Sequence, residues 1–208
     1  MAQKTFSIAE ALNFGWNTLK ANLGFFAGLF VIIGVINLGP SLLGSSLDQD
    51  TAFLLLAFAL SLAGWVLGVI ISLGLIKVTL AFVDGKKPDF ADLFRAYPLF
   101  FRYLLASIVY GLIVFFGFLL FIVPGVIWLV KYRFYLYFLV DQGAGPMEAL
   151  SKSAKITQGM LLRLFWFGIL LIILNFFGVL ALGVGLAITV PVSALADAFV
   201  YRKLSRPE

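Results

Sequence analysis

The sequence predicts an all-α polytopic membrane protein with six transmembrane helices, arranged as three hairpins that each follow an interfacial amphipathic helix. Two observations carry this prediction. The 208 residues are 62% hydrophobic and 12% charged, with a mean hydropathy of +1.09, whereas soluble domains are about half apolar and a quarter charged. Apolar blocks also recur at lengths near the ~20 residues that cross a bilayer. The composition therefore disfavours a soluble globular enzyme, and six spans fill a single membrane domain, residues 1–208.

The first unit begins with an amphipathic segment over residues 7–22. Ser7 and Glu10 have the spacing of a capping box, which predicts a helix start. The residues of one face recur at the helical period: Ile8, Leu12, Gly15, Trp16 and Leu19. We expect this helix to lie in the membrane interface, with the first span following at about 23–43.

The second span is predicted at about 52–76, and its helix is expected to continue to Val83, beyond the bilayer. A polar segment with glycine and proline, residues 84–88, breaks it. Asp89 is a helix-capping residue type, so it predicts a second interfacial helix over 90–96.

The apolar stretch over 103–140 is too long for one span. The dipeptide Pro124-Gly125 favours a tight turn, which predicts spans at 103–123 and 126–140. Pro146 is a favoured first residue for a third interfacial helix, which is expected to end near Gln158 with Gly159 as its C-cap. The last hairpin is predicted over 164–201, turning near residues 183–185, with Pro191 in its second arm.

The three units are possible internal repeats, with boundaries at 7–83, 89–140 and 146–202. Glu10-Ala-Leu12 matches Glu148-Ala-Leu150, and the same offset places Asn37 on Asn175. Chance alignment of apolar helices is the alternative explanation.

The distribution of basic residues predicts the orientation. The three loops inside the hairpins contain no Lys or Arg, and 13 of the 15 basic residues fall on the other side. The positive-inside rule then places both termini and the three surface helices in the cytoplasm of a prokaryotic cell, with the spans in its inner membrane. The same rule accounts for the net charge of +5, so we expect no nucleic-acid partner.

The chain contains no His and no Cys. This composition excludes Ser-His-Asp and Cys-His nucleophiles, the usual zinc sites and iron–sulfur clusters. Asp89 and Asp92 lie in the first turn of a predicted helix, where acidic residues favour the helix dipole. We therefore expect no catalytic residues, no metal and no cofactor.

A candidate intramembrane polar site lies in the fourth predicted span. Lys131 and Arg133 lie about 12–15 Å along a helix from the end of that span, where a charge usually faces protein or water. One reading is a cationic site for an anionic solute or a lipid headgroup. The other is an internal ion pair with Asp197, combined with snorkelling. The nearby Tyr135 and Tyr137 suit either reading.

Two further features lie within predicted spans. The amides of Asn37 and Asn175 favour hydrogen bonding between helices over ligand binding. The Gly64–Gly68 pair forms a GxxxG motif, which is typical of close packing between helices of one chain or between two protomers.

Three segments carry a resemblance to a known family: Ile122-Val-Pro-Gly to Arg133 followed by Asp141, then Glu148 to Ser153, and the closing run from Gly183 to Tyr201-Arg202. Together they resemble a widespread prokaryotic family of six-span membrane proteins of unknown function, related to the membrane domain of glycerophosphoryl diester phosphodiesterases. The resemblance implies the six-span topology and no catalytic residues. Lys131 and Asp197 depart from the family's pattern.

The sequence predicts a non-catalytic integral membrane protein, a structural or accessory module that binds membrane lipids or another membrane protein. The alternative is a small transporter or channel for an anionic solute that uses Lys131 and Arg133. The two predictions differ in whether water reaches Arg133.

Overall fold

A computed structural model describes residues 6–44, 51–181 and 183–206, with the backbone alone for residues 36–44 and 51–54. Every regular element within these ranges is helical, which confirms the all-α prediction. Four segments in them are long and apolar enough to cross a membrane, or five if a bent helix pair counts as one span. The membrane class is thereby supported, whereas six spans arranged as three hairpins are not confirmed.

The amphipathic helix α1 (Ile8–Ala21) begins as the sequence predicts, because the Ser7 side chain accepts a hydrogen bond from the Glu10 backbone N–H. The chain then bends by 89° into α2 (Leu23–Gly44). The buried face of α1 contains Gly15 and Leu19, whereas Trp16 is 45% exposed. Gly15 and Leu19 thus pack inward, while Trp16 lies at the surface.

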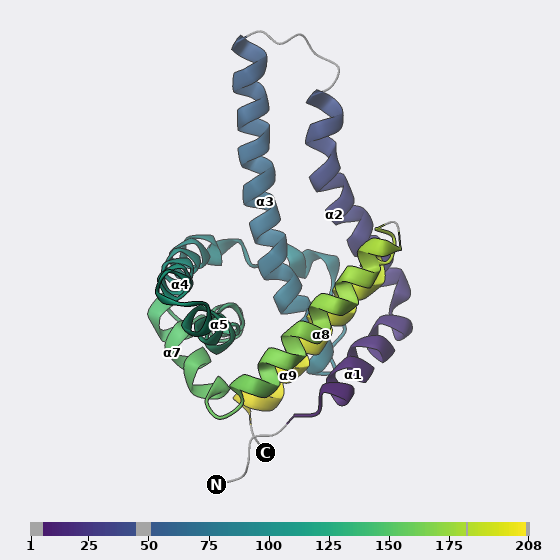
Figure 1. Cartoon of the computed structure of the whole chain (residues 1–208). Helices are drawn as coiled ribbons and strands as arrows, with labels where there is room; N and C mark the ends of the chain where they lie inside the picture. The colour runs from purple at the N-terminus through teal and green to yellow at the C-terminus, as the bar shows by residue number, and fades with distance from the viewer. Residues whose placement is uncertain (1–5, 45–50, 182, 207–208) are drawn as a thin grey trace.

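α3 (Thr51–Val83) is a single helix of 33 residues, or about 50 Å. It packs against α2, and Figure 1 shows the two helices projecting together from the rest of the molecule. Its first half carries exposed apolar residues such as Leu55 and Phe58, whereas Leu73, Val78 and Thr79 in its second half are fully buried. The predicted continuation past the bilayer-spanning part is thus a helix that enters the protein core.

The predicted surface helix over 90–96 is wrong in type. The segment forms two short 3-10 turns, η1 (Phe90–Leu93) and η2 (Tyr97–Leu99). Asp89 does cap η1, and Asp92 bonds back to its backbone N–H at 3.0 Å. The end of η1 packs closely on α3, because a Cβ on Gly74 would lie only 2.0 Å from the Leu93 carbonyl oxygen.

The predicted turn at Pro124-Gly125 is also wrong. α4 (Phe100–Leu120) ends earlier, and α5 (Ile122–Lys131) begins directly after Phe121, whose backbone is extended. Pro124 falls in the first turn of α5, where a missing N–H costs nothing. Gly125 lies where α4 and α5 cross closely, since a Cβ on Gly117 would be 2.9 Å from the Gly125 Cα.

The remaining helices are α6 (Tyr135–Gln142), α7 (Pro146–Thr157), α8 (Leu161–Leu180) and α9 (Leu186–Ser205). The fourth predicted span is therefore not one straight helix, because it breaks between α5 and α6. α7 ends close to its predicted boundary, with Gly159 at a φ of +81° just beyond it.

α9 is the central helix of the core and packs against α1, α3 and α8. It contains Asp197, Arg202 and Lys203, and it is not among the described helices apolar enough to span a membrane. Figure 1 shows α8 and α9 lying across the molecule, while α4 and α5 are seen almost end-on. The paired helices therefore point in different directions instead of forming one parallel bundle.

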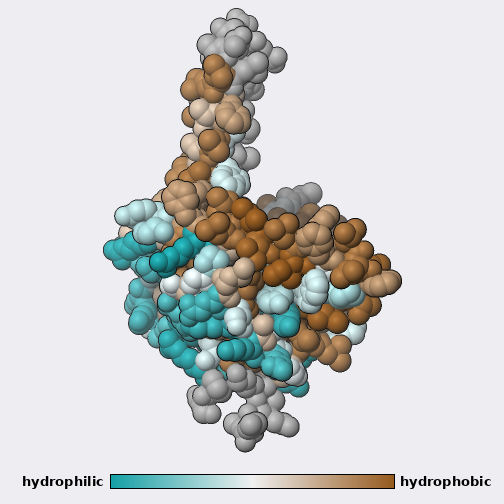
Figure 2. All heavy atoms as spheres, turned by 90° about the vertical axis from the view of Figure 1, so that its left-hand side faces the viewer, coloured by the Kyte–Doolittle hydropathy of each residue, from teal (hydrophilic) through white to brown (hydrophobic). Residues whose placement is uncertain are grey.

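The surface separates into apolar and polar regions. On the face shown in Figure 2, hydrophobic residues predominate on the coloured part of the projection and in a broad band beside it, and hydrophilic residues gather below. Large exposed apolar side chains occur on α3, α4 and α8 in particular. This separation is typical of a protein embedded in a membrane with one polar side.

Candidate functional site

The break between α5 and α6 has its own hydrogen-bonding partners. The Phe134 backbone N–H donates to Ser153 Oγ at 3.1 Å. The Lys131 carbonyl accepts from Ser153 Oγ at 3.1 Å and from Thr157 Oγ1 at 3.0 Å. Two hydroxyl groups of α7 therefore satisfy backbone groups that a continuous helix would have paired internally. This arrangement fixes the position of Arg133, which lies in the break.

Arg133 is paired within the chain. Its Nη2 donates to Asp197 Oδ1 of α9, and its Nη1 donates to the Leu164 carbonyl at 3.3 Å. The guanidinium also lies 5.3 Å from the ring centroids of both Phe134 and Phe167. The side chains of Arg133 and Asp197 are 17% and 25% exposed, so the pair is largely removed from solvent.

A cavity of about 680 Å3 adjoins this ion pair. Its walls come from α5, α8 and α9, with Tyr110 of α4 at one side, and it reaches the surface beside Leu129 and Ile172, which are 44% and 67% exposed. The volume falls within the ~300–1,000 Å3 typical of small-molecule sites. Four predicted site residues line it: Arg133, Tyr137, Asn175 and Asp197.

Asn175 links α8 to α9 across the cavity wall. Its Nδ2 donates to Ser193 Oγ and to the Leu171 carbonyl, both at 2.9 Å. Its Oδ1 is buried and accepts no hydrogen bond from the described part of the chain. The amide therefore joins two helices. The side chain of Asn37, its predicted counterpart, lies outside the described residues.

The other predicted site residues lie elsewhere. Lys131 Nζ lies 5.6 Å from the ring centroid of Tyr132, away from the ion pair of Arg133. Tyr135 shares a 3.0 Å hydrogen bond with Ser107 and stacks on Tyr110 at 4.8 Å. The structure therefore separates the two cations that the sequence had grouped.

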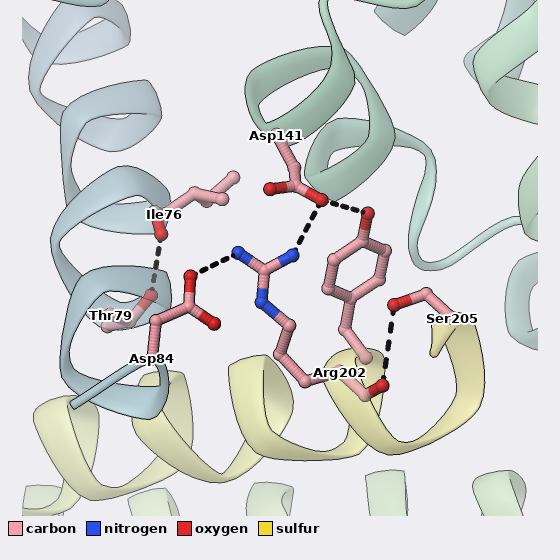
Figure 3. A network of polar contacts seen from close by, with 7 residues as sticks. Ile76, Thr79, Asp84, Asp141, Arg202 and Ser205 are labelled. Carbon is pink, nitrogen blue, oxygen red and sulfur yellow. Dashed lines mark hydrogen bonds and ion pairs between the residues drawn. The ribbon is translucent and has the colours of Figure 1, made fainter. Parts of the chain in front are cut away.

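Sequence reasoning missed a second buried arginine. Arg202 of α9 donates to Asp84, after the end of α3, and to Asp141 of α6, each at 2.7 Å. The Tyr201 hydroxyl donates to the same Asp141 carboxylate at 2.9 Å. Figure 3 shows the guanidinium between the two carboxylates. The available signal was the presence of Asp141 and Tyr201-Arg202 in the segments that carry the family resemblance.

The small-residue motif does not form a close contact at Gly68. A Cβ there would meet no described atom within 4 Å, whereas one on Gly28 would lie 2.8 Å from the Phe90 ring. Gly28 therefore serves packing within the chain. Self-association through Gly64 and Gly68 stays a prediction.

The site contains a cation, a carboxylate, hydroxyls and an amide around an apolar space. Within the described ranges, no group of three or more His, Cys, Asp or Glu side chains is placed to hold a metal ion. The arrangement suits the binding of an apolar or amphiphilic molecule, because most of its lining residues are aliphatic or aromatic.

Comparisons with known proteins identify relatives, and the names of these relatives state no activity. No protein-family model matches the chain, and no solved structure gives a significant match. Similar proteins occur in Mycobacterium tuberculosis (two strains) and Mycobacterium bovis, and all three are named as uncharacterised. Each is 28% identical in an alignment of 232 positions that covers 96% of this chain and 69% of the relative. The resemblance to the six-span family stays a prediction.

Proposed function

We propose that this chain is a non-catalytic protein of the prokaryotic inner membrane that works as a structural or accessory module by holding a membrane lipid. In this proposal both termini face the cytoplasm. Its support is the set of apolar helices long enough to cross a bilayer, together with the segregation of basic residues to one side of the predicted hairpins.

The pairing of Arg133 carries the proposal. To bind an anionic solute, the Arg133 guanidinium would have to face the cavity without another partner. The Arg133 charge is instead met by Asp197, by the Leu164 carbonyl and by two aromatic rings. Because breaking a buried pair leaves a costly unpaired charge, an incoming anion would have to displace Asp197. The cavity therefore favours an uncharged occupant.

The position of the cavity favours a lipid chain. Leu129 and Ile172 at its rim belong to the exposed apolar surface, which faces acyl chains in a membrane. An acyl chain can enter from the side of the protein. Its contacts with neighbouring lipids are then replaced by contacts with the aliphatic walls of the cavity.

Photo-crosslinking tests this proposal. The full chain is reconstituted in nanodiscs that contain a lipid with a diazirine in its acyl chain, and crosslinked peptides are identified by mass spectrometry. We expect crosslinks in α5 and α8 at the cavity lining. Ile169→Trp, which fills the cavity, should reduce them several-fold. Ile173→Trp is the matched control, because Ile173 lies on the same helix, is 49% exposed and does not line the cavity. Equal crosslinking in both variants would contradict lipid occupancy.

Transport of an anionic solute is the second candidate, and the contact between the cavity and Arg133 favours it. The absence of cysteine from the sequence allows a direct test. Single cysteines at Leu129, Val130 and Tyr137 are treated with a membrane-impermeant maleimide from either side, with Asp48 and Lys86 as topology controls. Labelling at the three test positions would indicate water around Arg133 and favour transport. Labelling of the controls alone, on opposite sides, is the result we expect.

A further inference from the structure

A second pocket, of about 300 Å3, lies beside the C-terminal end of α3. α6 and α9 close it, and Asp141 and Arg202 of the network in Figure 3 form part of its wall. It shares no lining residue with the cavity beside Arg133. The two pockets are therefore separate sites.

The carboxylates that line this pocket already have partners within the chain. Asp84 and Asp141 both bind Arg202 at 2.7 Å. Asp92 binds Arg95 at 2.9 Å and accepts the Asp89 backbone N–H at 3.0 Å. Asp84 and Asp141 share the one Arg202 guanidinium, so this cluster leaves a single negative charge at the wall of the pocket.

Three lysines of the pocket have no such partner. No carboxylate of the described chain lies within ion-pair distance of Lys77, Lys86 or Lys87, although all three line the pocket. The three lysine charges exceed the one negative charge that the Arg202 cluster leaves over, so the pocket is net positive around a space large enough for a phosphate group. The electrostatics therefore favour an anion.

The turn that carries two of these lysines is well defined. Gly85 has a φ of +69°, and the Lys86 backbone N–H donates to the Ala81 carbonyl at 2.9 Å. Lys86 and Lys87 are therefore held at the end of α3 next to the pocket. They also line a neighbouring pocket of about 390 Å3 beside α1, so both sides of the turn are open to a ligand.

The segment that follows supports a position of this pocket near the lipid headgroups. Tyr97 in that segment is 66% exposed. Tyrosine and tryptophan side chains gather at the boundary between acyl chains and water. Basic pockets at that boundary on the cytoplasmic side bind lipid phosphates.

We propose that the Lys77/Lys86/Lys87 pocket binds the phosphate of an anionic membrane phospholipid. Lysine ammonium groups donate hydrogen bonds to the phosphate oxygens, and the Arg202 network keeps the wall of the pocket in place. This site differs from the proposed acyl-chain cavity in location and in ligand chemistry, so either proposal can fail without the other.

Lipid titration of the detergent-solubilised full chain tests the site, with the thermal unfolding midpoint as the readout. Phosphatidylglycerol, phosphatidylcholine and inorganic phosphate are added in separate arms. We expect phosphatidylglycerol to raise the midpoint at the lowest concentration. The double variant Lys86→Gln/Lys87→Gln should raise the half-saturating concentration about thirtyfold. The double variant Lys152→Gln/Lys155→Gln, with the same loss of charge on α7, should leave it unchanged.

Three results would overturn the proposal. Equal responses to phosphatidylglycerol and phosphatidylcholine would remove the preference for an anionic headgroup. Equal losses in the two double variants would indicate a non-specific charge effect. A response to inorganic phosphate as strong as that to phosphatidylglycerol would identify a free-phosphate site. Lys77→Gln, a change at an exposed side chain, provides a second variant if the double variant does not fold.

Discussion

Two buried arginines, Arg133 and Arg202, are held in contrasting ways. Arg202 lies between two carboxylates, and its side chain is 10% exposed. It ties the end of α3, α6 and α9 together. Arg133 has one carboxylate partner, is 17% exposed and borders a cavity. Both arginines border a pocket, so the difference lies in the number of carboxylates that hold each one: two hold Arg202 in the core, and one holds Arg133.

The largest expected effect is at Arg202. Arg202→Met leaves Asp84 and Asp141 facing each other without a cation, and breaking a buried ion pair costs about 3–5 kcal/mol. Unfolding of the purified protein in mixed micelles of increasing SDS content measures the loss. Lys203→Met is the control, because this neighbouring lysine is 46% exposed in its pair with Glu10 and should cost less than about 1 kcal/mol. Similar losses of stability in the two variants would show that Arg202 does not hold the core helices together.

A smaller effect is expected at Arg133, where one carboxylate is left unpaired instead of two. Arg133→Met should lower the free energy of unfolding by about 3 kcal/mol. Asp197→Asn in the same chain should restore part of it, because no unpaired carboxylate remains. The double-mutant cycle should give a coupling energy of about 1–3 kcal/mol. Independent, additive effects would contradict the pairing.

The third prediction concerns the break between α5 and α6, in which Arg133 lies. Ser153→Ala leaves the buried Phe134 N–H without its acceptor, which costs about 1–3 kcal/mol. Ser151→Ala on the same helix is the control, since Ser151 is exposed. Micellar unfolding measures both variants. If Ser153→Ala were as stable as its control, the α7 hydroxyls would not be needed to hold the break.

The exposed ion pair between Arg95 and Asp92 should have the smallest effect on stability. The pKa of Asp92 is lowered by the hydrogen bond from the Asp89 backbone and by Arg95, which is 63% exposed. A lowered pKa in the folded state adds stability above the unfolded value of about 4, and this stability is lost as the pH falls through the folded pKa. Asp92→Asn should therefore cost less than about 1 kcal/mol at pH 7.

Unfolding measured from pH 7 down to pH 3 tests the last prediction. The difference between the natural chain and Asp92→Asn should shrink as the pH falls, because the Asp92 carboxylate is progressively protonated and loses the interactions that lower its pKa. A difference of the same size at pH 7 and pH 3 would assign the effect to packing instead of charge.

Local features of the sequence determined the membrane class and the boundaries of α1, α3 and α7. The Ser7 cap, the Asp89 cap and the helix beginning at Pro146 depend on hydrogen bonds and dihedral angles within a few residues, which the sequence displays directly. The same local reasoning failed at Pro124, because its position in the first turn of a helix depends on where α4 and α5 cross.

Local sequence patterns did not predict which charged side chains pair with each other. Lys131 and Arg133 are two residues apart, and no local pattern says which of them meets Asp197, 64 residues beyond Arg133. The break after α5 turns Arg133 toward α9, while the Lys131 side chain lies over Tyr132. Contacts between distant segments also created the Arg202 network, which joins residues up to 118 positions apart.

By itself, the sequence determined that this is a helical membrane protein, because hydropathy and helix periodicity are properties of short segments. Tertiary structure alone decided which charges are neutralised inside the chain, where the two pockets open and which lysines stay unpaired. The physical reason is that a buried charge is stabilised by whichever opposite charge the packed helices bring within contact distance, and that distance is set by the whole fold.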